Sequence, residues 1–129
     1  MEGTILNKPK QHRKGIVIER SGRITLRSRP CRLLSLTVGC YVSFALAAGQ
    51  MYLLREPQRP VNEGALRLCG RPSQMHCCSV ATAQELFRQT TGADDRQKIE
   101  LNVSPEKSSV VVDGVEFEAL AIINIVDNL

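Results

Sequence analysis

Four residues of types that bind metals or form disulfides lie near the middle of the chain: Cys69, His76, Cys77 and Cys78. A structural zinc site uses cysteine pairs separated by about two to four residues, so that both sulfurs reach one ion at tetrahedral angles. Cys77 and Cys78 are adjacent, and no second pair follows them. The spacing therefore favours a disulfide from Cys69 to Cys77 or Cys78, and we expect neither a metal nor a cofactor.

The same cysteines provide a route to a dimer and argue against catalysis. One disulfide among the three thiols leaves one thiol unpaired. In an oxidising compartment an unpaired thiol typically forms a disulfide with another chain. Nucleophilic catalysis would need a base facing a thiol, whereas His76 is only a sequence neighbour of Cys77. No phosphate-binding glycine loop or zinc-protease motif occurs. We expect no enzymatic activity; a redox or metal protein using His76 and these cysteines is the alternative.

Two other side chains are candidates for covalent modification. Cys31, between Arg29 and Arg32, has the basic surroundings of a palmitoylated cysteine at a membrane boundary, with an unmodified cytosolic thiol as the alternative. Asn102-Val103-Ser104 is an acceptor sequence for N-glycosylation if it lies in the secretory lumen. Both predictions depend on how the chain is placed relative to a membrane.

That placement depends on an uncharged segment from Leu33 to Leu54. A helix needs about 20 apolar residues to cross a bilayer. The segment therefore predicts a transmembrane or signal-anchor helix over residues 33–54. Small residues recur along it at every fourth position, where they would form a face on which a second helix could pack: Ser35, Gly39, Ser43 and Ala47.

A cleaved signal sequence is the alternative for the same segment. Ala45-Leu46-Ala47 before Ala48 fits the small-residue pattern that signal peptidase recognises. Cleavage there would release the remainder of the chain as a secreted protein. The long basic region before the segment is unusual for a signal peptide, and it favours the anchor.

The two flanks of this segment carry opposite charge. Residues 1–32 contain nine Lys or Arg and two acidic residues, a net charge of +7, whereas residues 55–129 contain eight and eleven, a net charge of −3. A basic flank stays in the cytoplasm, which predicts type II topology with residues 55–129 extracellular or luminal. The excess of basic residues is confined to the arm, so we expect it to contact anionic lipids and not nucleic acid.

Within residues 1–32, the predicted cytoplasmic arm, one part has the pattern of a hairpin. Residues 7–14 are polar and interrupted by proline, which predicts disorder. Ile16-Val17-Ile18 and Ile24-Thr25-Leu26 are short β-favouring runs, and Ser21-Gly22 between them is typical of a turn.

The chain beyond residue 54 divides into a stalk and a small domain. Residues 55–76 are rich in Pro and Gly and predict an extended stalk. In residues 77–129, Thr82 and Glu85 have capping-box spacing at the start of a short helix that Gly92 would end. Alternation over residues 99–103 predicts a strand, and Asp113-Gly114 predicts a tight hairpin turn. The predicted fold class is α+β: one membrane or signal-anchor helix, then a domain of one short helix and three or four antiparallel strands.

One stretch of this outer region resembles a known family. Leu66-Arg67-Leu68-Cys69, followed by Cys77-Cys78-Ser79 and Glu85, is similar to the early cysteine-rich stretch of glypicans, the cell-surface carriers of heparan sulfate. The resemblance covers residues 66–85 and implies a cell-surface location.

Together these patterns predict a single-pass membrane protein whose small, disulfide-stapled outer domain binds a protein partner in an accessory, regulatory or ligand-like role. Its expected partners are membrane lipids, contacted through the basic arm and the span, an unidentified protein, and a second copy of the chain. The alternative is a secreted, cysteine-containing factor released by cleavage near Ala47, with a glypican-like place at the cell surface.

Overall fold

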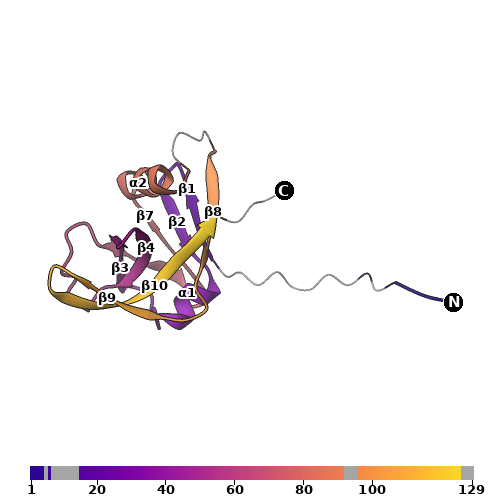
Figure 1. Cartoon of the computed structure of the whole chain (residues 1–129), viewed down its shortest axis with the longest axis horizontal. Helices are drawn as coiled ribbons and strands as arrows, with labels where there is room; N and C mark the ends of the chain where they lie inside the picture. Colours follow the sequence, from indigo (N-terminus) through magenta and orange to yellow (C-terminus); the bar gives the residue numbers. More distant parts are fainter. Residues whose placement is uncertain (5, 7–14, 92–95, 126–129) are drawn as a thin grey trace.

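The computed structural model describes residues 1–4, 6, 15–91 and 96–125, which form a mostly-β protein. The described residues form two short helices and a sheet, which is strongly curved (Figure 1). The elements in chain order are β1 (Gly15–Glu19), β2 (Arg23–Leu26), α1 (Ser28–Leu33), β3 (Tyr41–Ala47), β4 (Gln50–Arg55), β5 (Leu66–Arg67), β6 (Cys69–Arg71), β7 (Gln74–Cys78), α2 (Val80–Thr91), β8 (Lys98–Val103), β9 (Ser108–Val112) and β10 (Val115–Ile125).

The ten strands make one antiparallel sheet that nearly closes on itself. Its order is β5-β3-β4-β10-β8-β1-β2-β7-β6, and β9 pairs with β10 beside this path. The end strands β5 and β6 are separated in the chain by Leu68 alone. The Leu68 N–H donates to the Cys40 carbonyl at 2.8 Å, and its carbonyl accepts from the Gly39 N–H at 2.8 Å. Leu68 therefore joins the two edges of the sheet, and its side chain is fully buried.

The curved sheet encloses the main hydrophobic core, and the helices lie at opposite ends of it (Figure 1). The side chains of Ile16 and Ile18 on β1 and of Ile24 and Leu26 on β2 point inward and are fully buried. α2 adds Phe87 and two neighbours from one helical face. The Arg20 guanidinium stacks over the Phe87 ring at 4.2 Å from its centroid, a cation–π contact that ties α2 to the β1–β2 turn.

A second, smaller apolar cluster lies on the other face of the sheet. Its buried members come from the hairpin strands β9 and β10 and from β4: Leu54, Val110, Phe117 and Ala119. Alternate residues of β3 and β4 thus contact different clusters, since Leu53 belongs to the main core and Leu54 to this one. Both faces of the β3–β4 hairpin are therefore largely covered by apolar neighbours.

The predicted α+β fold class with a membrane or signal-anchor helix is wrong. Neither helix in the described residues has the length and apolar character that a bilayer crossing requires. Most of the segment from residue 33 to 54 is instead the β3–β4 hairpin, in which residues 42–47 pair with residues 50–55. Ala48 and Gly49, with φ of 51° and 79°, reverse the chain between the two strands.

The predictions made from local turn patterns are confirmed. β1 and β2 pair around the turn at Ser21-Gly22, and Gly22 has the positive φ of 110° that glycine permits. β9 and β10 pair around Asp113-Gly114. The strand over residues 99–103 and the short helix are also present, although the helix begins at Val80, before the predicted start. Gly92, the predicted helix end, and residues 7–14, predicted to be disordered, lie outside the described residues.

Strands from all four predicted regions of the chain pair in this one sheet. The predicted arm supplies β1 and β2, and the segment predicted as a stalk supplies β5, β6 and the start of β7. β1 pairs along its whole length with β8, from Gly15 opposite Asn102 to Glu19 opposite Lys98. Segments about 80 residues apart in sequence thus form the centre of the sheet.

Candidate functional site

A cleft on one side of the sheet lies between β3–β4, the loop before β5 and the start of α2. It encloses about 440 Å³, which is within the range of ligand pockets in proteins. Apolar side chains from four separate parts of the chain contribute to its lining: Phe44, Ala45, Leu54, Leu66, Leu86 and Val112. Polar groups of Asn62, Glu63, Thr82 and Glu85 also line it.

The carboxylate of Glu56 holds the loop at one side of this cleft. It is only 3% exposed, and it accepts hydrogen bonds from the Ser43 hydroxyl at 2.9 Å and the Asn62 amide at 2.7 Å. The backbone N–H groups of Val61 and Asn62 add two longer bonds of 3.3 Å. A buried carboxylate is stable only with such partners, so the loop is fixed to β3 and the cleft wall is preformed.

The opposite wall is the first part of α2, and Ser79 sets where that helix begins. The Ser79 Oγ accepts a hydrogen bond from the Thr82 N–H at 3.2 Å, the contact of an N-cap residue. The Ser79 N–H donates to the Gly22 carbonyl at 2.8 Å, which fixes this end of α2 to the β1–β2 turn. The capping box predicted for Thr82 and Glu85 is wrong, because the cap lies three residues earlier.

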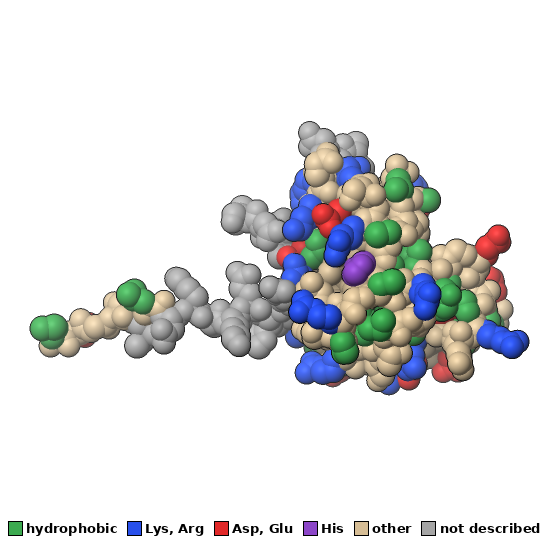
Figure 2. All heavy atoms as spheres, turned by 180° about the vertical axis from the view of Figure 1, so that it is seen from behind, with side chains coloured by type: hydrophobic (Ala, Val, Ile, Leu, Met, Phe, Trp, Pro, Cys, Tyr) green, Lys and Arg blue, Asp and Glu red, His purple; other side chains and the backbone are tan. Residues whose placement is uncertain are grey.

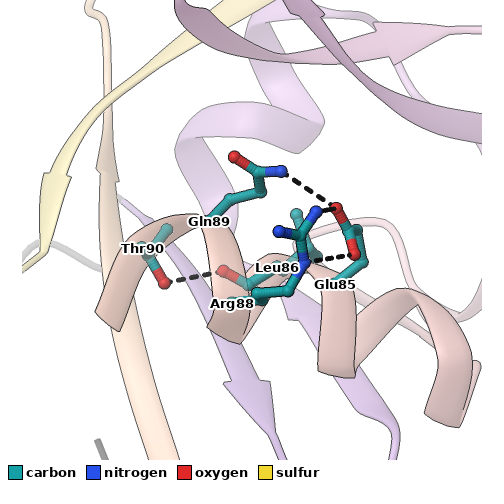
Figure 3. Close-up of polar contacts among 5 residues, drawn as sticks. All are labelled: Glu85, Leu86, Arg88, Gln89 and Thr90. Atoms are coloured by element: carbon teal, nitrogen blue, oxygen red, sulfur yellow. Dashed lines mark hydrogen bonds and ion pairs between the residues drawn. The ribbon is translucent and has the colours of Figure 1, made fainter. Parts of the chain in front are cut away.

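Glu85 is instead paired along the helix surface, as Figure 3 shows. Its carboxylate accepts from Arg88 through both Nε, at 3.0 Å, and Nη2, and from Gln89 Nε2 at 2.9 Å. The hydrogen bonds from Arg88, and then that from Gln89, lower the pKa of Glu85 to about 2. Glu85 therefore remains ionised at neutral pH and presents a paired, fixed carboxylate at the cleft.

The composition of this lining is that of a binding site. Among the described residues that line the cleft, two carry carboxylates, and none is a histidine, cysteine, lysine or arginine. An apolar lining with a few fixed polar groups is typical of a site that holds an apolar side chain of a ligand and bonds the polar atoms beside it.

The structure does not support the predicted disulfide, since all five cysteines are free. Cys69 lies opposite His76 in the β6–β7 pair, so Cys77 points to the other face, where it is 5% exposed within the core. Cys78 shares the outer face with Cys69 but lies two residues beyond its cross-strand partner. Diagonal neighbours of this kind are about 7–8 Å apart at Cα, farther than a disulfide usually spans.

The environment of these thiols differs sharply. Burial, and next the neighbouring Cys78 and Cys69 thiols, raise the pKa of Cys77 to about 12, whereas Cys69 and Cys78 are exposed. Among the residues that the structure describes, no three His, Cys, Asp or Glu side chains gather as a metal site requires. Figure 2 shows one face of the molecule, on which Lys and Arg side chains lie around a histidine side chain.

The two modification candidates lie in ordered elements. Cys31 in α1 is 3% exposed, and its thiol donates to the Leu26 carbonyl at 3.4 Å. Burial raises its pKa, so acylation of Cys31 would require α1 to open. Asn102 lies in β8, where its side-chain amide donates to the Asn124 Oδ1 at 3.0 Å, so glycosylation would displace that bond.

The four residues of the predicted helix-pairing face do not share a helix. Ser35 follows α1 with φ of 49°, and Gly39, with φ of 94°, precedes β3. Ser43 and Ala47 lie in β3, where both point to the side of the second apolar cluster. Ser43 has a different use, because it anchors Glu56.

Comparison of this chain with protein-family models, with curated proteins and with solved structures found no match. The resemblance of residues 66–85 to glypicans thus gains no support, and those residues form β5, β6, β7 and the start of α2. Sequence reasoning missed the cleft itself. Glu56, which follows Arg55 at the end of an apolar run and precedes Pro57, is a local signal of a carboxylate with a structural role.

Proposed function

We propose that this protein is a binding module that holds an apolar side chain of a protein partner in the cleft between β3–β4 and α2. The observation that carries the proposal is a cleft with an apolar lining and two fixed walls, one held by Glu56 and the other by the Ser79 cap. Because both walls are fixed before binding, little conformational entropy is lost when a ligand enters.

The polar groups at the cleft suggest the chemistry of the bound segment. Asn62, Thr82 and the carboxylate of Glu63 can bond peptide N–H groups and a basic side chain. We expect the preferred segment to carry a large apolar residue next to a basic residue. The lipid contact of the basic arm and the membrane-associated or secreted location remain predictions.

The test is selection of short peptides from a random displayed library against the full chain, followed by calorimetry of the enriched peptides. The blocking variant is Ala81→Trp, because Ala81 is an exposed residue of α2 that lines the cleft. The matched control is Gln84→Trp, an exposed residue of the same helix that does not line it.

We expect enriched peptides to contain the apolar–basic pattern, and Ala81→Trp to weaken their binding at least about tenfold, which corresponds to about 1.4 kcal/mol. Gln84→Trp should bind like the natural chain. Equal binding by both variants, or failure to enrich any peptide, would overturn the proposal.

A further inference from the structure

Within the described part of the chain, β9 is an edge strand with one unpaired side. Among the described residues it pairs only with β10, and its sequence, Ser-Ser-Val-Val-Val, contains no charge and no proline. Natural edge strands are usually protected by lysine, proline or a bulge within the strand, because their unpaired N–H and C=O groups attract another strand. An unprotected edge with a high β-propensity indicates a pairing surface.

The hairpin geometry identifies which backbone groups are free. Asp113 and Gly114 form a two-residue turn, with φ of 50° and 80°, between Val112 and Val115. In such a hairpin the flanking residues are a hydrogen-bonded pair, and the pattern alternates along the strands. Val112 and Val110 therefore direct their N–H and C=O groups to β10, whereas Val111 and Ser109 direct theirs outward.

We infer that this edge binds a second copy of the chain, with the two β9 strands antiparallel about a two-fold axis at Val110. In this register all five residues of β9 are paired with the second copy. Ser109 then lies opposite Val111 of the other copy, and Val110 lies opposite Val110. These outward groups make about four intermolecular hydrogen bonds. The same register places Lys107, whose ammonium donates to Glu118 of its own chain at 3.0 Å, opposite Asp113 of the second copy, so that charges of opposite sign lie at both ends of the pairing.

The side chains agree with this pairing. Val110 faces the second apolar cluster, so two such clusters would become neighbours across the axis. Val111, on the opposite face, is 64% exposed in the single chain, and it would be covered in part by the second copy. A two-fold interface of this kind uses the same patch on both partners and is closed, which stops growth at a dimer.

The test measures mass and amide exchange of the full chain over a range of concentrations. Sedimentation should show a reversible dimer. In exchange measured by NMR, the Ser109 and Val111 amides should be protected only at high concentration, whereas Val110 and Val112 should be protected throughout by β10. This alternation reports the register and does not depend on a variant.

The disrupting variant is Val111→Pro, which removes an N–H that points away from β10 and is therefore tolerated at an edge. We expect it to raise the dimer dissociation constant at least about tenfold. Val38→Pro, at another exposed valine in a turn, is the matched control and should leave the dimer unchanged. Asp113→Asn keeps a residue that suits the turn and should weaken the dimer through lost charge, an effect that added salt removes.

A chain that stays monomeric, exchange at Ser109 and Val111 that does not change with concentration, or a dimer that survives Val111→Pro would overturn the inference. If Val111→Pro does not fold, the concentration dependence of amide exchange at Ser109 and Val111 and the dimer affinity of Asp113→Asn test the inference instead. The failure of this inference and the failure of the proposed peptide cleft are distinguishable, because the cleft test uses α2 variants and this test uses Val111 and Asp113, which do not line the cleft.

Discussion

Single residues in this protein have roles that their neighbours in the sequence do not predict. Ser43 was predicted to lie on a helix-pairing face because small residues recur at every fourth position. In the structure its hydroxyl donates to the buried Glu56 carboxylate, and the serine thereby fixes a loop that lies beyond the next strand. A residue type alone cannot indicate a partner that only the fold brings near.

The thiols of β7 give a prediction at this scale. Cys77 and Cys78 are neighbours in sequence, but only Cys77 is buried, and desolvation disfavours its thiolate and raises its pKa to about 12. At pH about 8 the Cys77 thiolate is therefore nearly absent, and its sulfur is also shielded from reagents, whereas Cys78 is exposed. We expect iodoacetamide to label Cys78 quickly and Cys77 only after unfolding, as followed by mass spectrometry of the digested protein.

Cys78 is the internal control for this experiment, since it differs from Cys77 mainly in the face to which it points. Labelling in denaturant should reach both residues at similar rates. Equal labelling of the two thiols in the native protein would show that β7 does not have the orientation described.

Among the elements, the β3–β4 hairpin has a composition that predicts a membrane helix although its residues form two strands. Its alternate residues face the main core and the second apolar cluster, so neither face needs charges. An uncharged run of this length therefore has the same composition as a membrane helix. The dipeptide Ala48-Gly49 is only weakly typical of a hairpin turn. Asp113-Gly114 and Ser21-Gly22 are more typical, so their hairpins could be predicted from sequence.

The pairing of β1 with β8 gives a prediction at the scale of elements. A Cβ added at Gly15 would lie 2.1 Å from the Leu101 carbonyl oxygen, closer than any real contact. Gly15→Ala must therefore push the two strands apart at this point, and we expect a loss of about 2–4 kcal/mol in the free energy of unfolding. Urea denaturation measures this loss.

Gly49→Ala is the matched control. A Cβ at Gly49 would have nothing within 4 Å, and the cost there is only the positive φ of 79°, about 1–2 kcal/mol. A smaller loss for Gly15→Ala than for Gly49→Ala would contradict the close approach of β1 to β8.

At the scale of the whole molecule, the sheet depends on strands from both halves of the chain. Hairpins could be predicted because their signals are local. The order of the strands and the cleft could not, because residues 41–66, α2 and β9 meet only through pairings between distant segments. The charge contrast between residues 1–32 and 55–129 is real, but β1 and β2 place part of the basic arm in the same sheet as the acidic part.

This dependence gives a prediction about a chain that begins at Ala48, the product of the alternative signal cleavage. It would lack β1, β2, α1 and β3, so β4, β7 and β8 would each lose a partner. We expect this fragment to show the circular dichroism of an unfolded chain and the full chain that of a β protein. A folded fragment with a cooperative thermal transition would contradict the one-sheet architecture and restore the secreted alternative.

The position of β10 also has a consequence for how the protein is made. β10 is the last described strand in the sequence, yet it lies between β4 and β8 in the sheet. While the ribosome still holds β10, the emerged strands β4 and β8 each present an open edge that its arrival will cover. Unpaired edges of this kind attract other chains. The nascent protein should therefore be most dependent on chaperones in the interval after β8 has emerged and before β10 has emerged.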